Sequence, residues 1–307
     1  MNQENEGEGG LRFGVNTDSF FGIGFGLIGN KNINASDASD VIDALKEKFA
    51  AFFSLLNSYG ISNIEINTEA EQLFPGFLSG IIFPMLKEQE IKSVSVHTPY
   101  LQLNPASPIE EYRRFSAAGV ARIINACHGF GVERFIIHPT SEFEDSIMLF
   151  PIPEKEKKAL IDIAVSQARK SLEEIIKATG IEPFKLAVEN LEVFPFDYVY
   201  PIIKDYSVSI CFDMGHWGLN GFMPGEFVEK FNPVSEIHIQ DMTTERQGLR
   251  TIIRREHSPL GVGELKVGSF FDYLKSRRFD GSLIIENRSA DDLNKSLEYL
   301  KTNGFLN

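Results

Sequence analysis

Six short apolar segments of the sequence each end in a side chain that can bind a metal ion or move a proton. These side chains are His97, His138, Glu189, Asp213, His238 and Glu286. Imidazole nitrogens and carboxylate oxygens are the protein ligands that zinc, manganese and related divalent ions take. A single His after an apolar strand is more often structural than a ligand. Six such ends with the same polarity, however, predict one shared site.

One set of these residues combines one imidazole with three carboxylates. Its members are Glu189, Asp213, His238 and Glu286. Such a set can hold one divalent ion and leave coordination positions for water or substrate. His97 and His138 could hold a second ion, with Glu189 as a carboxylate that bridges the two.

A further His lies in the segment Asp213-Met-Gly-His216, where Gly215 would permit a tight bend after the strand. Together with His257, His216 could form a third metal position or bind substrate. Salt bridges are the ordinary role of a buried carboxylate, and Arg288 could pair with Glu286 in that way.

The elements that must position these residues alternate between strand and helix. Strands are expected at 11–17, 63–67, 93–97, 134–138, 185–189, 209–213, 235–238 and 282–286. Apolar residues recur close to the helical period of 3.6 residues at 40–59, 110–130 and 155–179, with Gly131 and Gly180 at the expected ends. Ser269 and Ser289 are expected N-caps of the last two helices.

Eight strands that alternate with helices, with no change of composition between them, predict an α/β single-domain (β/α)8 TIM barrel over residues 11–307. In such a barrel the carboxyl ends of all strands surround one mouth. A doubly wound open sheet is the alternative, but it gathers ligands from the few strands beside one crevice. Ligands at six strand ends favour the closed barrel.

Composition narrows the possible partners and the cellular location. The chain of 307 residues carries a formal net charge of −13, which repels a nucleic-acid backbone and makes DNA an improbable partner. Two cysteines, Cys127 and Cys211, imply no disulfide framework and favour the reducing cytoplasm. Residues 1–10 are polar and rich in Glu and Gly, which predicts a disordered lead-in. No apolar run approaches the ~20 residues that span a membrane.

The segment 243–257 stands out in this acidic chain because it is rich in arginine. Its arginines are Arg246, Arg250, Arg254 and Arg255. Arg side chains match phosphate and carboxylate groups, so the segment could be a loop that clamps an anionic substrate, or simply a solvated loop. Tyr100 and Gln240 are further candidates for substrate contact.

Several motifs resemble those of the xylose-isomerase-like TIM-barrel superfamily of sugar isomerases, epimerases and AP endonucleases of the endonuclease IV type. The most specific stretches are Cys211-Phe-Asp-Met-Gly-His216, Glu236-Ile-His238 and His257-Ser-Pro-Leu-Gly-Val-Gly-Glu264. The similarity runs from about Leu11 to Leu300. It implies a TIM-barrel enzyme that uses one to three divalent ions, with zinc or manganese expected.

The two branches of the superfamily imply different roles for the same residues. Similarity to the isomerases and epimerases implies one ion, with Glu189 and Glu286 as proton shuttles. Similarity to endonuclease IV implies three zinc ions held by His97, His138, Glu189, Asp213, His216, His238, His257 and Glu286. One further ligand of that pattern, two residues before His257, is Arg255 here, and Glu256 is a displaced substitute.

These observations favour a metal-dependent hydrolase of a small anionic metabolite, such as a phosphoester or an amide, through metal-activated water. The alternative is a sugar or sugar-phosphate isomerase or epimerase that uses a single ion. An AP endonuclease is less favoured, because residues 67–74, after the second strand, contain no basic DNA-inserting loop. A non-catalytic binding barrel would leave eight intact ligand positions without a purpose.

Overall fold

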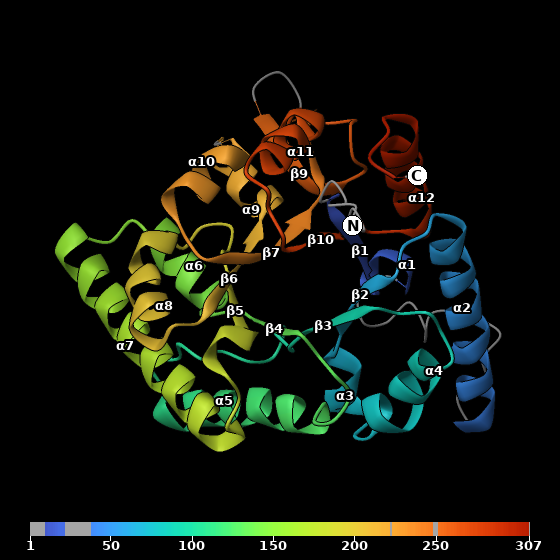
Figure 1. Ribbon diagram of the computed structural model, residues 1–307. Coiled ribbons are helices and arrows are strands. Elements are labelled where there is room, and N and C mark those ends of the chain that lie inside the picture. The colour runs from blue at the N-terminus through green and yellow to red at the C-terminus, as the bar shows by residue number, and fades with distance from the viewer. Residues whose placement is uncertain (1–9, 22–37, 222, 248–250, 307) are drawn as a thin grey trace, which may run out of the picture.

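A computed structural model describes residues 10–21, 38–221, 223–247 and 251–306. Eight parallel strands close into a barrel in the order β1-β10-β7-β6-β5-β4-β3-β2 (Figure 1). The strands are β1 (Arg12–Asn16), β2 (Asn63–Asn67), β3 (Ser93–His97), β4 (Arg134–Ile137), β5 (Leu186–Glu189), β6 (Ser209–Asp213), β7 (Val234–Ile239) and β10 (Ser282–Ile285). The predicted (β/α)8 barrel is confirmed, and every barrel strand lies within one residue of its predicted bounds.

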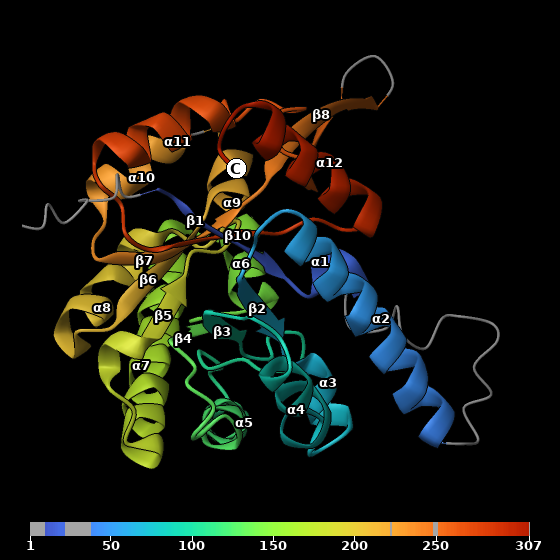
Figure 2. The same ribbon diagram turned by 45° about the vertical axis from the view of Figure 1, so that its right-hand side comes forward.

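Helices form a ring around the strands (Figure 1). They are α1 (Asp18–Phe21), α2 (Ala38–Ser58), α3 (Glu69–Leu73), α4 (Phe83–Lys87), α5 (Glu110–Ala126), α6 (Glu142–Leu149), α7 (Glu154–Thr179), α8 (Tyr200–Tyr206), α9 (Met214–Leu219), α10 (Pro224–Lys230), α11 (Val267–Ser276) and α12 (Ala290–Thr302). The structure also contains a π-helical turn, η1 (Leu78–Ile82), and two 3-10 turns, η2 (Pro183–Lys185) and η3 (Phe196–Tyr198). The last helix, α12, packs beside α1 and so closes the ring (Figure 2).

The strands bury both of their faces, which is why their sequences read as continuous apolar runs. Val188 and Phe212 belong to the large core between strands and helices. Ile136, Ala187 and Cys211 form a separate buried cluster, and each stands two residues before a predicted ligand. Side chains two residues apart share one face of a strand. The predicted ligands therefore lie on the inner face of the barrel, directly above an apolar layer.

Two predicted helix boundaries agree with the structure. Helix α7 ends at Thr179, and Gly180 follows it with φ 62, a left-handed conformation that glycine adopts at little cost. Helix α12 begins after Ser289, whose side chain accepts a hydrogen bond from the backbone N–H of Asp292.

Two other boundaries were predicted wrongly. Helix α5 ends at Ala126 rather than near residue 130, because a turn with Gly129 and Gly131 at positive φ follows it. Helix α11 begins at Val267, with Lys266 as its N-cap, so Ser269 lies inside the helix rather than before it.

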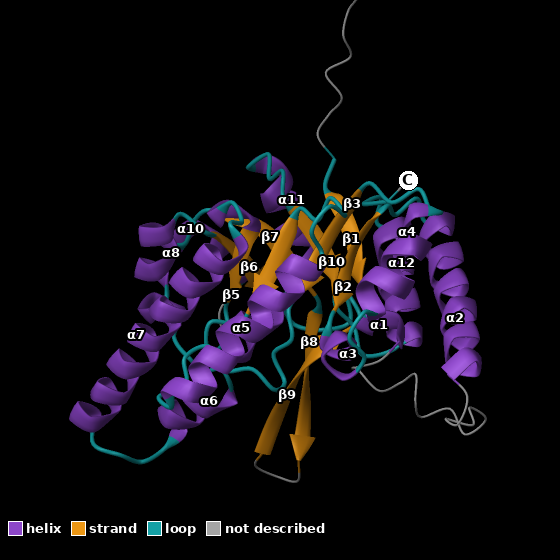
Figure 3. Ribbon diagram, turned by 90° about the horizontal axis from the view of Figure 1, so that it is seen from below, coloured by secondary structure: helices purple, strands orange, loops and turns teal. Residues whose placement is uncertain are grey.

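The arginine-rich segment is also different from its prediction. It is an antiparallel hairpin of β8 (Asp241–Gln247) and β9 (Thr251–Ser258), which projects from one end of the barrel (Figure 3). Each of the two strands contains a run of threonine or isoleucine residues, and β-branched residues favour extended backbone.

None of the described helices combines the length and apolar character that crossing a bilayer requires. The lead-in predicted at residues 1–10 lies outside the described residues, apart from its last position.

Candidate metal-dependent active site

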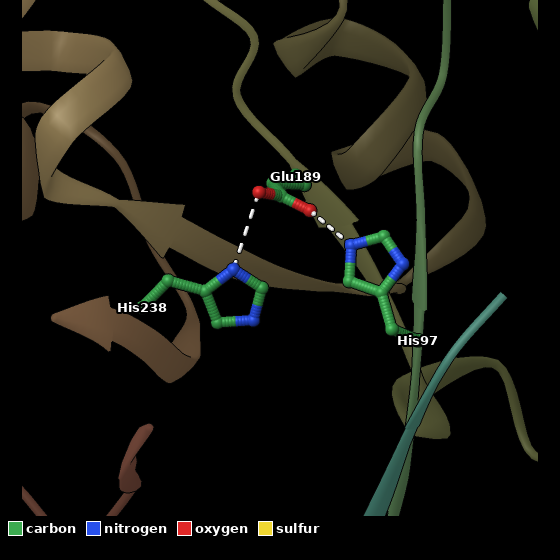
Figure 4. Close-up of side chains that lie close together, drawn as sticks. All are labelled: His97, Glu189 and His238. Carbon is green, nitrogen blue, oxygen red and sulfur yellow. Dashed lines mark hydrogen bonds and ion pairs between the residues drawn. The ribbon is translucent and has the colours of Figure 1, made fainter. Parts of the chain in front are cut away.

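Glu189 stands at the centre of the site, at the carboxyl end of β5 (Figure 4). Its Oε2 lies 3.1 Å from His97 Nε2 and 3.0 Å from His138 Nε2. Its Oε1 lies 3.2 Å from Nδ1 of His238, on the other side of the carboxylate. Because each oxygen faces different imidazoles, the carboxylate could bridge two neighbouring metal ions.

The other predicted carboxylates gather around the same imidazole of His238. Its Nδ1 lies 3.5 Å from Glu286 Oε1 and 3.9 Å from Asp213 Oδ2. Asp213 also accepts a hydrogen bond of 2.7 Å from the backbone N–H of His216 through Oδ1, and so caps α9. The barrel thus brings together all four members of the one-imidazole, three-carboxylate set.

Backbone carbonyls fix the orientation of two imidazoles. The Nδ1 of His97 lies 3.0 Å from the carbonyl oxygen of Thr98, and the Nδ1 of His216 lies 2.9 Å from that of Asn190. A carbonyl oxygen can only accept, so Nδ1 must carry the proton in both rings. Nε2, which in each ring faces a carboxylate, is therefore the nitrogen left to bind a metal ion.

A buried carboxylate does the same for His238. The Nε2 of His238 lies 3.1 Å from Glu65 Oε2, so Nδ1 is the nitrogen left to face the ligand carboxylates. Asn16 donates to Glu65 Oε1 and, over 3.0 Å, to Glu286 Oε1. Glu65 and Asn16 were not predicted as site residues, yet they link the imidazole to one of the ligand carboxylates.

A third group consists of His216, Glu256 and His257. The two oxygens of Glu256 lie 3.7 Å from Nε2 of His216 and 3.6 Å from Nε2 of His257. Glu256, the predicted substitute for the ligand that is missing from the sequence pattern, thus lies between these two imidazoles. Its Oε2 is buried without a hydrogen-bond partner among the described residues, which is costly unless a cation binds there. This donor set fits a divalent ion.

The electrostatics of the site reflect a dense mixture of buried acids and bases. Burial alone would lower the pKa of His97, but the hydrogen bond and charge of Glu189 raise it to about 9. Burial raises the pKa of Glu286 to about 8 and that of Glu256 to about 7. Burial, together with the positive charge of His216, lowers the pKa of His257 to about 3. Opposing shifts among touching groups are typical of functional sites.

Most of the predicted ligand side chains, but not the fully buried Asp213 and His238, line a pocket of about 190 Å³ at the barrel mouth. Tyr100 forms part of its wall and stacks on His138, with ring centroids 4.7 Å apart. Burial and the surrounding carboxylates raise the pKa of Tyr100 far above its usual range, so its hydroxyl keeps a proton to donate. Arg288 also lines the pocket and lies 3.8 Å from Glu256, rather than beside Glu286 as the sequence suggested.

Other residues predicted to contact substrate lie elsewhere. Gln240 is completely buried and donates to Asp213 Oδ2 over 2.7 Å, so it orients a predicted ligand instead of contacting substrate. Arg254 donates to the carbonyl oxygens of Gly218 and Leu219 at the end of α9. Neither of them lines the pocket.

The remaining arginines of the hairpin do not complete the predicted clamp. Arg255 pairs with Glu245 on the exposed side of the hairpin, at 3.0 Å, and does not line the pocket. Arg250 and the side chain of Arg246 lie outside the described residues. Arg254 and Arg255 therefore do not form an arginine clamp over the pocket.

Comparisons with known proteins agree with this geometry. Residues 84–303 match the family described as "Xylose isomerase-like TIM barrel". An uncharacterized protein of Methanocaldococcus jannaschii is 27% identical over 225 residues, which cover 70% of this chain and 71% of the relative.

Two solved structures share the fold. A D-tagatose 3-epimerase-like protein has a TM-score of 0.65 at 22% identity, and the match covers 95% of this chain and 97% of the other. Endonuclease IV from Thermus thermophilus has a TM-score of 0.58 at 15% identity, with 95% and 98% covered. Because the family match spans more than half of its length, the chain belongs to the xylose isomerase-like TIM-barrel family, which includes metal-dependent isomerases, epimerases and endonucleases.

Proposed function

We propose that this protein is a multinuclear metal-dependent hydrolase that cleaves the phosphoester bond of a small metabolite. The proposal depends on one observation: the two carboxylate oxygens of Glu189 face different imidazoles. Oε2 faces His97 and His138, whereas Oε1 faces His238. In a reaction that needs a single ion, His97 and His138 would be substrate contacts rather than metal ligands. Neighbouring metal positions joined by a carboxylate are typical of enzymes that displace an alcohol from phosphorus.

Three groups of residues would hold the ions. The first is His97, His138 and Glu189; the second is Glu189, Asp213, His238 and Glu286; the third is His216, Glu256 and His257. Zinc or manganese suits these nitrogen and oxygen donors. When bound, such ions polarise the phosphoryl oxygens and lower the pKa of water.

The protein's own residues supply the rest of the site. Arg288 brings a positive charge to the pocket, and Tyr100 offers a protonated hydroxyl to a phosphoryl oxygen. In the reaction, a water oxygen bonds to phosphorus while the bond from phosphorus to the alcohol oxygen breaks. The proton that water loses is then returned to the alcohol.

A second candidate is a single-metal sugar isomerase or epimerase, the activity class printed for the tagatose epimerase-like neighbour. One observation favours it. The charges of His238 and His138 overcome burial and hold the pKa of Glu189 well below its usual range, whereas burial raises the pKa of Glu286 to about 8. A proton shuttle between two carboxylates needs one ionised and one protonated member.

We further propose that the substrate is a small molecule rather than DNA and that the protein is cytoplasmic. Glu69 and Glu71 occupy α3, where a DNA-inserting basic loop would follow the second strand, and this supports a small-molecule substrate rather than DNA. Cys127 and Cys211 are buried and unpaired, which supports a reducing compartment such as the cytoplasm.

Two parallel assays on metal-loaded protein separate the candidates. The hydrolase predicts release of inorganic phosphate from small phosphomonoesters, which Glu189→Gln abolishes. The epimerase instead predicts incorporation of solvent deuterium into a ketose, followed by proton NMR, without phosphate release. Deuterium incorporation alone would overturn the proposed hydrolysis.

A further inference from the structure

A second cavity adjoins the pocket at the barrel mouth, which we call the metal pocket, and is larger than it. We name it the distal cleft; its volume is about 410 Å³, against about 190 Å³ for the metal pocket. Tyr100, His138 and Glu192 line both cavities, so the two meet at these side chains. A molecule bound at the metal ligands can therefore extend past Tyr100 into the distal cleft.

Apolar side chains form much of the wall of the distal cleft and remain open to solvent. Leu101, Ile109, Tyr112 and Phe143 line it, and each is between 40% and 61% exposed. Tyr112 comes from α5 and Phe143 from α6, so aromatic rings stand on two separate elements. Partly exposed aromatic side chains around a concave surface are typical of a site that binds the flat face of a ligand.

The charge of the distal cleft has one sign. Glu142, Asp145 and Glu192 line it, and its described lining residues include neither Lys nor Arg. A second phosphate or carboxylate of the ligand would be repelled there. Carboxylate oxygens do, however, accept hydrogen bonds from hydroxyl and amine groups.

Hydrogen bonds hold the segment between β3 and α5, which forms one side of the cleft. Oε1 of Glu69 accepts the backbone N–H groups of Tyr100 and Leu101 over 2.7 and 2.9 Å. Asn104 donates over 3.1 Å to Glu144 of α6, which connects this segment to the opposite side of the cleft. A cleft that is already formed loses little entropy when a ligand binds.

We propose that the distal cleft binds an uncharged ring that carries hydroxyl or amine donors, as a sugar or a nucleoside provides. Tyr112 and Phe143 would stack on the ring, and the carboxylates would accept its hydrogen bonds. The substrate is then a phosphomonoester with one anionic group, held in the metal pocket, and a neutral ring in the distal cleft. The assignment of the phosphate rests on the proposed function, whereas the ring site rests on the cleft itself.

Hydrolysis of matched substrates tests the complete proposal. Metal-loaded protein should show a higher kcat/KM for a hexose monophosphate or adenosine monophosphate than for glycerol phosphate, and should reject a hexose bisphosphate. Phe143→Ala should reduce the preference for the ring over glycerol phosphate roughly threefold to tenfold. Phe150→Ala is the matched control, because Phe150 follows the same helix, is 52% exposed and does not line the cleft. Equal kcat/KM for all the monoesters would overturn the proposal.

A binding measurement keeps the ring site separate from the hydrolysis. Adenosine and methyl glucoside, which carry no phosphate, are titrated into chelator-treated protein and followed by saturation-transfer NMR. Binding that Phe143→Ala weakens and Phe150→Ala does not supports the ring site even where no phosphate is released, and the tighter of the two ligands identifies the source of the ring. Absence of binding by both ligands, or equal binding by both variants, contradicts the ring site whatever the outcome of the hydrolysis assay.

Discussion

Glu65 holds the imidazole of His238 from inside the barrel, with Oε2 lying 3.1 Å from Nε2 and both side chains completely buried. Burial would raise the pKa of Glu65, but the charge of His238 keeps it below its usual value, so the carboxylate stays ionised and accepts the Nε2 proton. A carboxylate on the far nitrogen of a metal-binding imidazole fixes the ring and increases its basicity.

Replacing this carboxylate should therefore weaken metal binding without unfolding the barrel. We expect Glu65→Gln to lower the affinity for zinc by about 10- to 100-fold, as measured by competition with a chromophoric chelator. The control is Glu88→Gln, since Glu88 is exposed at the end of α4. Equal affinities of the two variants would show that Glu65 does not support the metal centre.

Asp213 is expected to be indispensable for the metal and only modestly important for the fold. Asp213→Ala removes a carboxylate from the site and the side-chain cap of α9. Loss of an N-cap costs about 1 kcal/mol, and the buried amide of Gln240 loses its acceptor at about 1–3 kcal/mol. The free energy of unfolding in urea should therefore fall by about 2–4 kcal/mol while the barrel stays folded and hydrolysis and metal binding disappear. A variant that retains activity would remove Asp213 from the site.

The titration of Asp145 should make the free energy of unfolding depend on pH. Burial and the charge of Glu192 raise the pKa of Asp145 to about 6, from an ordinary value of 3.8. The folded state therefore holds this proton more tightly than the unfolded state, and the contribution of Asp145 to stability falls as the pH rises from about 4 to about 6.

Asp145→Asn removes this titration and keeps an oxygen that can accept the backbone N–H of Phe194. We expect the free energies of unfolding of the variant and the wild type to agree near pH 4 and to diverge in favour of the variant above pH 6. Urea unfolding at several pH values measures the difference. A constant difference across this range would contradict the raised pKa.

A buried arginine joins α5 to α7. Arg113 is completely buried and donates to Glu110, Glu174 and Ser171. Arg113→Met should lower the free energy of unfolding by about 2 kcal/mol, because it removes the hydrogen bonds of a buried guanidinium to two half-exposed carboxylates and to Ser171. Arg114→Met is the matched control: Arg114 pairs with the same Glu110, but its side chain is 68% exposed, so its loss should cost less than about 1 kcal/mol. Chemical denaturation of both variants should show this contrast, and equal losses would contradict it.

The sequence was sufficient to predict the site residues at the strand ends, but not the supporting residue Glu65. His97 and Glu189 follow uninterrupted apolar runs, so their places at the ends of buried strands could be predicted. Glu65 lies in Asn63-Ile-Glu-Ile-Asn67, an alternation that reads equally well as a strand with one face in water. Only closure of the barrel buries that face and brings Glu65 to His238.

In the hairpin of β8 and β9, the chemistry of the arginines could be predicted from the sequence, but the direction of their side chains could not. Arg254 and Arg255 have the chemistry of an anion clamp, but side-chain type alone does not reveal where an arginine points. Strand pairing between β8 and β9 directs Arg255 to Glu245, and the end of α9 receives Arg254. Arg288 lines the pocket instead, and its position follows from the end of β10 rather than from any cluster of charge.

The central claim is that Glu189 bridges neighbouring metal ions, and the number of metal ions bound per chain tests it most directly. Elemental analysis of protein purified without chelator should find at least two zinc-class ions per chain, and His138→Ala should lose one of them while the ion held by Asp213 and His238 remains. A single ion per chain that is unchanged in His138→Ala would contradict the multinuclear site and favour the single-metal epimerase.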